Sequence, residues 1–388
     1  VSWDEAFEVI ISKISNISNE NCVGVVGNQV ENESIFAFRE LFKKLNLNKI
    51  LPFQKKLTFS NENRSNYLFN SKIEGLDKCD YLLLIGANPR VDSAILNARI
   101  RKNYIHRDLK ISSISSQQFD LKFNYEYLGS DVKILTSILE DKHKISNDFK
   151  NANFPMIIIG DEVLQNDCSL DVQKVSTSIL KKFGGFNKNW NGFNILHNYA
   201  STVGAIDILS EYSDYNYLAF KNDINKNLIK FVYLLNADDF DFDISDCFVI
   251  YQGHHGDKGA QLADVILPGA AYTEKEGSYT NLEGRVQYSQ RATFPPGDAK
   301  EDWTILRALS EKLGKKLDFD NLLQLREIMF SSKTMLKFDE NIYSSEPKII
   351  IKSDFKSSKL NYENKNFFMT CPISRCSSTM AECSQVNG

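Results

Sequence analysis

The stretch from Gly253 to Gln287 carries the densest set of side chains in this chain that could take part in binding or catalysis. Asp264 precedes a short apolar segment that ends at Pro268, and a polar loop follows. The polar side chains of that loop are Glu274, Glu276, Asn281, Glu283 and Arg285. Because ligands of open α/β sheets bind where the strands end, this order predicts the floor of a pocket in an α/β fold.

The chemistry of this loop stays open at the level of residue types. Glu274 and Glu276 could form an acid/base pair, but positions i and i+2 of a loop have no predictable separation. His254 and His255 suggest a metal site. Neighbours in sequence tend to point apart and rarely bind one ion together, so hydrogen bonding within the loop is the default expectation.

Two further patterns resemble functional motifs only in part. Cys371, Cys376 and Cys383 lack the closer spacing of paired thiolates in zinc and iron–sulfur sites, so a reduced, packed tail is expected. Gly24-Val-Val-Gly27 follows a strand-like segment but lacks the third glycine of a dinucleotide fingerprint. The sequence Ile85-Gly-Ala-Asn-Pro89 could be a ligand-approaching turn or an ordinary one.

Length and composition limit the class of protein. A chain of 388 residues suggests two or three domains, and a formal charge of −4 gives no support for nucleic-acid binding. The apolar runs have strand length, short of the ~20 residues of a membrane helix. The high counts of 26 Phe and 16 Tyr against 8 Pro indicate AT-rich coding, as in an organelle genome or a very AT-rich nuclear genome. Asp4, Glu5 and Glu8 are unlike a mitochondrial import leader.

Strand-like and helix-like segments alternate along the chain. We expect helices where apolar residues recur at helical spacing, at Glu33–Leu45, Asp92–Tyr104, Asp131–Leu139 and Leu170–Phe183. Strands are expected at Cys22–Val26, Tyr81–Ile85, Leu109–Ile114, Pro155–Ile159, Lys230–Leu235 and Cys247–Tyr251. This alternation predicts the α/β class, with parallel sheets covered on both faces.

A distant internal repeat predicts two such units. Asp80–Asp92 and Phe231–Asp241 both run from an apolar strand through a small residue to a polar, acidic loop. We therefore expect a first α/β unit at residues 1–150, a second at 151–314 with the loop 253–287, and a small C-terminal extension at 315–388. The polar run Asp141–Asn153 is the expected linker between the units.

The C-terminal part gives weaker signals. Asp298 is expected to cap a helix at Lys300–Leu313, and Gly314 to end it. A short helix at Leu322–Phe330 and a strand at Lys348–Lys352 follow. The last ~25 residues are expected to be a docked or mobile tail.

Specific motifs spread over nearly the whole chain point to one family. They are Val1–Phe7, Ile85–Arg90, Asn97–Lys102, Asn194–Ser201, Tyr251–Gly259, Ala263–Gly277, Asn281–Arg285, Glu301–Glu311, Pro372–Arg375 and Met380–Glu382. Together they resemble the molybdopterin oxidoreductases, and within them the branch formed by the largest iron–sulfur subunit of respiratory complex I. The resemblance implies two doubly wound, Rossmann-like units.

The resemblance also implies a role in the matrix (peripheral) arm of mitochondrial complex I, on the matrix side of the inner membrane. Complex I passes electrons from NADH through FMN and iron–sulfur clusters to ubiquinone. The ferredoxin-like cysteine motifs of the family do not occur in this sequence. The clusters are therefore expected on an N-terminal half, and FMN on a partner flavoprotein subunit. Matrix-arm subunits are the expected partners, without nucleic acid and without a membrane span.

For this chain we expect no catalytic, cofactor-binding or metal-ligating residue. Gln54–Ser60 offers no ligand loop for molybdenum, and Gly284 replaces an arginine common in the enzymes. About 75 residues follow the Lys300–Gly314 helix, too few for the domain that closes over the pterin and a tail. We thus expect that the chain retains the pterin cleft of the family but binds no pterin there. The alternatives are an active molybdopterin enzyme of the formate dehydrogenase type, or a metal site at the tail cysteines.

Overall fold

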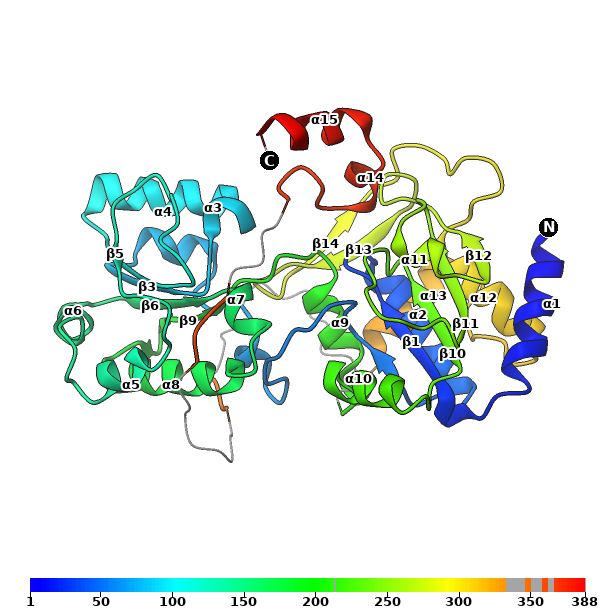
Figure 1. Cartoon of the computed structure of the whole chain (residues 1–388), viewed down its shortest axis with the longest axis horizontal. Helices are drawn as coiled ribbons and strands as arrows, with labels where there is room; N and C mark the ends of the chain where they lie inside the picture. Colours follow the sequence, from blue (N-terminus) through cyan, green and yellow to red (C-terminus); the bar gives the residue numbers. More distant parts are fainter. Residues whose placement is uncertain (213, 333–345, 350–357, 362–365, 388) are drawn as a thin grey trace.

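Continuous apolar runs form the centres of two five-stranded parallel sheets in the computed structural model (Figure 1). Every residue is buried in β1 (Cys22–Val26), β3 (Tyr81–Ile85), β6 (Pro155–Ile159) and β10 (Phe231–Leu235). A strand covered on both faces needs apolar side chains on both, which explains why these runs do not alternate. The structure describes residues 1–388 except 213, 333–345, 350–357, 362–365 and 388.

The first sheet, with strand order β12-β11-β10-β1-β2, defines lobe 1. Its other strands are β2 (Ile50–Leu51), β11 (Phe248–Gly253) and β12 (Val265–Pro268). An antiparallel hairpin, β13 (Gly277–Thr280) with β14 (Val286–Ser289), belongs to the same lobe. The helices are α1 (Trp3–Ile14), α2 (Asn32–Lys44), α9 (Thr202–Ile208), α10 (Tyr217–Asn225), α11 (Lys258–Gln261), α12 (Asp302–Lys312) and α13 (Leu322–Ser331).

The second sheet, with strand order β5-β4-β3-β6-β9, defines lobe 2. Its remaining strands are β4 (Lys110–Ile114), β5 (Glu126–Tyr127) and β9 (Phe193–Ile195), and a small hairpin pairs β7 (Phe186–Asn187) with β8 (Trp190–Asn191). The helices are α3 (Pro89–Asp92), α4 (Ala94–Arg107), α5 (Ile134–Leu139), α6 (Ser146–Asn151), α7 (Asp161–Leu164) and α8 (Ser169–Lys182). Successive residues of β3 enter different cores, Leu83 with α5 and α8, and Leu84 with α4.

Helix α2 shows why the predicted helices form. Its apolar positions Ile35, Phe38, Leu41 and Phe42 recur at helical spacing, and each is at most 1% exposed. Phe38 meets Tyr233 of β10 with ring centroids 5.2 Å apart, which fixes the helix against the sheet.

The division of the chain between the lobes differs from the predicted boundary at residue 150. β6 lies beyond that boundary but pairs with β3, and β10 pairs with β1. Lobe 2 is therefore inserted into lobe 1, which the chain begins and later completes. The two repeat segments do mark the two units, because β3 and β10 lie at corresponding inner positions of their sheets. The error lay in assuming that each unit is continuous in sequence.

The predicted linker Asp141–Asn153 is also wrong, because it contains α6. Phe149 of that helix is fully buried and contacts Tyr81 at a centroid distance of 4.6 Å. Helix α12 begins at Asp302 with Glu301 as its N-cap, so Asp298 is not the cap. Lys348 and Ile349 are not in a strand, and the rest of the predicted strand Lys348–Lys352 lies outside the described residues.

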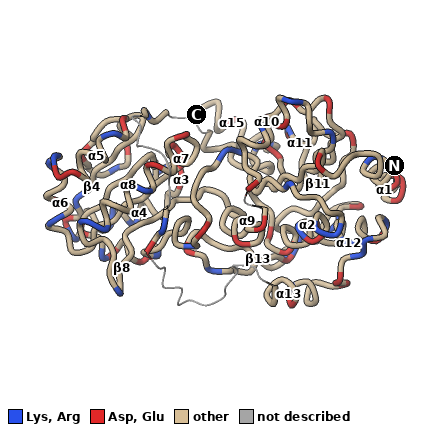
Figure 2. Tube along the Cα trace, turned by 90° about the horizontal axis from the view of Figure 1, so that it is seen from below, with Lys and Arg blue, Asp and Glu red and all other residues tan. Residues whose placement is uncertain are grey.

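The C-terminal extension ends in two helices, α14 (Pro372–Arg375) and α15 (Ser378–Asn387), which lie above the junction of the lobes in Figure 1. Figure 2 shows acidic and basic residues interspersed over both lobes. Within the described ranges, no helix has both the length and the apolar character needed to cross a bilayer.

Candidate functional site

The acids of the Gly253–Gln287 stretch are directed to separate backbone partners. Asp264 Oδ2 accepts a hydrogen bond from Val249 N at 2.8 Å. Glu274 Oε2 accepts one from Ala271 N at 2.9 Å. Glu283 Oε1 accepts one from Ile73 N at 2.7 Å. Glu274 stabilises a local turn, while Asp264 and Glu283 hold more distant backbone segments. The three carboxylates do not converge on a common point, so they do not form the predicted pocket floor.

Glu276 and Asn281 are likewise structural. Glu276 forms an ion pair with Arg326, with Oε1 and Nη1 2.6 Å apart. The same arginine pairs with the buried Glu33 of α2, so it joins α13 to α2 and to the loop. Asn281 Oδ1 accepts from the backbone N atoms of Glu283 and Arg285, each at 3.0 Å, and holds the hairpin turn. Arg285 itself is exposed.

The two histidines point toward each other and not apart, contrary to the expectation for sequence neighbours. Their Nδ1 atoms lie 2.6 Å apart, so one ring donates to the other. Burial, followed by the nearby Lys275, lowers the pKa of His254 to about 4, which favours its neutral form. Among the described residues, no group of three His, Cys, Asp or Glu side chains is arranged to hold a metal ion.

Lys275 lies in a buried ionic network beneath the loop. Its Nζ is 2.6 Å from Glu31 Oε2 and also pairs with Asp302, and the three side chains are at most 3% exposed. Burial alone would lower the pKa of Lys275, but the carboxylates of Asp302 and Glu31 outweigh it and raise that pKa. Gln252 Nε2 donates to Asp302 Oδ1 at 2.9 Å, and Tyr233 OH donates to Gln252 Oε1 at 2.7 Å. The network therefore ties the loop to α2, α12 and two central strands.

The cavity best placed for ligand binding lies elsewhere, between the carboxyl ends of both sheets. We call this cavity, of about 530 Å³, the interlobe cleft. In both sheets the strand order reverses between two neighbouring strands, β1 and β10 in one and β3 and β6 in the other. Such switch points are the usual ligand sites of doubly wound folds. Residues that follow strands of both sheets line the cleft: Asn28, Gln29, Gln54, Lys55, Val91, Asp92, Asn198, Tyr199, Ala200, Asp238 and Asp239.

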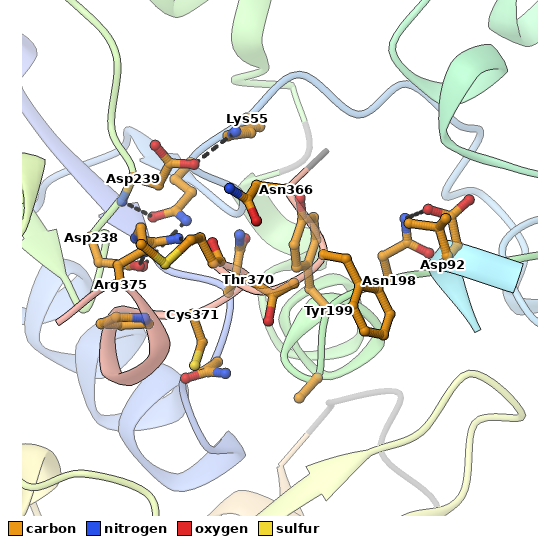
Figure 3. A pocket seen from close by; sticks show the side chains of 18 of the residues that line it. Lys55, Asp92, Asn198, Tyr199, Asp238, Asp239, Asn366, Thr370, Cys371 and Arg375 are labelled. Atoms are coloured by element: carbon orange, nitrogen blue, oxygen red, sulfur yellow. Dashed lines mark hydrogen bonds and ion pairs between the residues drawn. The ribbon is translucent and has the colours of Figure 1, made fainter. Parts of the chain in front are cut away.

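Most polar side chains of the interlobe cleft are paired within the protein. Figure 3 shows two groups on opposite sides of it. In one group, Lys55 Nζ lies 2.7 Å from Asp239 Oδ2. In the other, Asn198 Nδ2 donates to Asp92 Oδ1 at 3.3 Å.

The C-terminal segment completes the lining of the cleft. Its contributing residues are Asn366, Phe367, Met369, Thr370, Cys371, Pro372 and Arg375. The Arg375 guanidinium pairs with Asp238 through Nη2 and with Asp257 through Nε. Asp238 is only 4% exposed, and burial raises the pKa of its carboxyl while Arg375 counteracts that rise. The chain thus supplies the counter-charge of its own cleft.

The residues of the cleft do not fit an anionic pterin cofactor. Apart from the C-terminal segment, its charged side chains are Asp92, Asp238 and Asp239 against Lys55. A cofactor that carries phosphate would meet a net negative lining, and the C-terminal segment stands in its way. Gln54, from the stretch without a metal ligand, donates from Nε2 to Asp238 Oδ1 at 3.3 Å.

The structure explains why position 284 is a glycine. Its φ of +83° is in the left-handed region, and a Cβ there would lie 2.9 Å from Leu68 Cδ1. Arg64 Nη2 donates to Gly284 O at 2.8 Å and to the fully buried Asp207 at 2.6 Å. An arginine side chain at position 284 would compete for this space. Gly86 also has a positive φ, but its close neighbour is Val163, so this turn packs against α7.

The tail cysteines have separate partners. Cys371 Sγ accepts from Ser374 N at 3.4 Å and caps α14, and Cys376 Sγ donates to Gly256 O at 3.7 Å. Cys383 lies in α15, and all three thiols are free.

Comparison with known proteins gives the class to which this fold belongs. The molybdopterin oxidoreductase family matches residues 1–312, and a family that describes the C-terminal region of a NADH-ubiquinone oxidoreductase subunit matches residues 345–383. The chain belongs to the molybdopterin oxidoreductase family. The predicted α/β class with two doubly wound units is thereby confirmed.

Within this family, the chain is similar to a complex I subunit, as the motifs predict. The NADH-ubiquinone oxidoreductase 75 kDa subunit of Reclinomonas americana is 38% identical over 406 residues, which cover 100% of this chain and 58% of that protein. The mitochondrial 78 kDa subunit of Candida albicans is 38% identical and covers 98% of this chain and 54% of that protein. The chain therefore spans about half the length of these relatives.

A solved structure supports the fold independently of sequence. It is the formyltransferase/hydrolase complex from Methylorubrum extorquens in complex with methylofuran, with a TM-score of 0.58. The match covers 81% of this chain and 97% of that chain at 12% identity. At this identity the likeness concerns the fold alone.

Sequence reasoning missed the residues with the greatest electrostatic role. Lys275 and Asp302 lie inside the family motifs, and Glu31 precedes a predicted helix, but nothing in their spacing shows that they meet. The sequence does contain one indication, since Lys275 stands between two glutamates at the end of a largely apolar motif. Arg375 was part of a motif without a role, and its partner Asp238 lies in a repeat segment.

Proposed function

We propose that this chain is a structural, non-catalytic portion of the largest subunit of mitochondrial complex I. It would belong to the peripheral arm, on the matrix side of the inner membrane. There it would support the iron–sulfur-bearing part of the subunit while electrons pass from NADH through FMN to ubiquinone. Both named relatives are subunits of NADH-ubiquinone oxidoreductase, and one is named as mitochondrial.

The observation that carries the non-catalytic role is that the chain's own C-terminal segment lines the interlobe cleft and pairs with its acids. Arg375 pairs with Asp238 and Asp257 at the switch point where a doubly wound fold ordinarily binds its ligand. The acids of the motif loop support this proposal, because they stabilise turns and helices. What remains is a two-lobed body with surfaces for neighbouring subunits.

The partners we propose are the cluster-bearing N-terminal half and the flavoprotein subunit. The test is to purify the chain from its native source through an epitope tag under mild detergent conditions, and to run the product on a native gel. We expect a large assembly that reduces a dye with NADH and contains flavin- and cluster-bearing polypeptides. Recovery of the tagged chain only as a small particle without these polypeptides would contradict the proposal.

A further inference from the structure

The C-terminal extension contacts both lobes. On lobe 2, Leu360 N donates to Ser130 O at 2.9 Å, and Val132 N donates to Ser358 O at 3.1 Å. The Leu360 side chain is 3% exposed and belongs to the core formed with α5 and α8. Figure 1 shows this piece in orange-red beside α7 and α8, while α14 and α15 lie over the junction toward lobe 1. The extension is therefore bound at two separate places.

On lobe 1 the docking is electrostatic. Arg375 reaches Asp238, which follows β10, and Asp257, which caps α11. Cys376 adds a contact from Sγ to Gly256 O at 3.7 Å. The cleft without this segment has an acidic lining, so a segment that carries an arginine is complementary to it in charge.

The lobes share a limited apolar contact, made by Leu57 and Phe59, which pack against a core of each lobe, and by Leu282 of the β13–β14 turn, which packs against a core of lobe 2. The two parallel sheets are separate, and none of the four described apolar cores contains residues from strands of both sheets. Interfaces of this kind within a chain normally permit motion of one domain against the other. A segment bound to both lobes therefore adds a restraint on their relative orientation.

We propose that the interlobe cleft is a binding site for the chain's own C-terminal segment, and that the docked segment fixes the orientation of the two lobes. Residues 358–361 bind the C-terminal extension to lobe 2, and Arg375 binds it to lobe 1. Because the segment is tethered, its effective concentration at the cleft is high and one ion-paired anchor suffices to keep it docked. This inference concerns the isolated chain and does not depend on assembly into complex I.

Hydrogen exchange of the full chain tests the anchor. Arg375→Ala is expected to raise amide exchange by at least about tenfold in residues 369–376 and 254–259, because the docked state loses its charge pairing. Exchange in β3 and β10 should be unchanged, which shows that both lobes remain folded. Arg90→Ala, which removes an exposed pair with Asp120, is the matched control without effect. Wild-type exchange in the Arg375→Ala chain would overturn the proposal.

Charge reversal and solution scattering test whether the docked C-terminal segment fixes the orientation of the two lobes. Arg375→Asp and Asp238→Arg should each increase exchange. The double variant should restore part of the protection, because the pair between positions 375 and 238 is re-formed in the opposite sense while Asp257 still faces an acid. Small-angle scattering of Arg375→Ala should give a larger radius of gyration than the unsubstituted chain, and the double variant should reverse the increase. Unchanged scattering despite faster exchange would show a docked tail that does not hold the lobes, and would likewise overturn the proposal.

Discussion

Lys275 is enclosed with two carboxyl groups, and burial raises the pKa of Glu31 while Lys275 counteracts that rise. Its Nζ contacts Glu31 and Asp302, each fully buried. Transfer of such charges out of water is costly, and removal of one partner leaves the others uncompensated. At the scale of single residues, the motif loop therefore contributes a buried electrostatic anchor for two helices.

Lys275→Met is expected to destabilise the chain by about 3–5 kcal/mol, because two buried acids lose their counter-charge. Urea unfolding followed by circular dichroism measures the loss. The control is Lys312→Met, which removes an exposed pair with Asp4 and should cost at most about 1 kcal/mol. Adding Glu31→Gln and Asp302→Asn to Lys275→Met should recover part of the loss. Equal effects of the two lysine substitutions would contradict the assignment.

His197 gives the chain a pH-dependent stability. The ring is 7% exposed, its Nε2 is 2.6 Å from Tyr67 O, and burial lowers its pKa to about 4. Between pH 6.5 and 4 the His197 imidazole is protonated in the unfolded chain and neutral in the folded chain. This contribution is therefore complete above pH 6.5 and falls as the pH is lowered.

At pH 5 the loss from His197 amounts to about 2 kcal/mol relative to pH 7. His197→Gln keeps a donor toward Tyr67 O and removes the titration. The difference in free energy of unfolding between pH 7 and pH 5 should shrink by that amount, as measured by urea titrations at both pH values. The exposed His106→Gln variant is the control. An identical pH dependence in all three chains would refute the role of His197.

At the scale of elements, the hairpin turn between β13 and β14 depends on Gly284. The backbone there is left-handed, and a Cβ would crowd Leu68 and Arg64. Gly284→Ala is expected to destabilise the chain by about 1–3 kcal/mol. Gly314→Ala is the matched control, since its φ of +68° is similar but no atom lies within 4 Å of its Cβ position. The excess loss at Gly284 in thermal unfolding measures the contact, and the absence of an excess would contradict it.

The elements that the sequence predicts well are those that one physical cause determines. The six predicted strands are found within two residues at either end, because a run buried on both faces must be apolar throughout. The predicted start of α12, with Asp298 as its cap, is too early. An Asp that follows Pro-Pro-Gly can stand in a loop as well as at the N-cap of a helix, and the sequence does not distinguish the two. Helix α6 lies within the predicted linker, because Phe149 is its only buried apolar residue and its neighbours are polar.

The candidate site was less predictable than the fold. Asp238 and Arg375 are far apart in sequence, and their pairing depends on where the C-terminal segment docks on lobe 1. Likewise, the hydrogen-bond and ion-pair partners of Glu274, Glu276 and Glu283 depend on which segments the fold brings next to them. The motifs could identify the family, but only the three-dimensional arrangement shows that these acids do not converge.

At the scale of the whole molecule, a structural role predicts a characteristic pattern in variants. Lys275→Met should lower the amount of assembled complex, because fewer chains are folded at a given time. The rate of NADH oxidation per assembled complex should stay the same, since a lysine that only holds helices together takes no part in electron transfer. Native gels quantify the assembly, and dye reduction by the excised band gives the rate. A lower rate at normal assembly would contradict the structural role.

The metal and pterin content of the assembly tests the central claim most directly. The measurement is the number of molybdenum, tungsten and pterin molecules per copy of this chain in the purified assembly, by elemental analysis and fluorescence of the extracted pterin. A non-catalytic body whose cleft is lined by its own C-terminal segment predicts values far below one for all three. One molybdenum or tungsten and at least one pterin per chain would contradict the account and favour a molybdopterin enzyme.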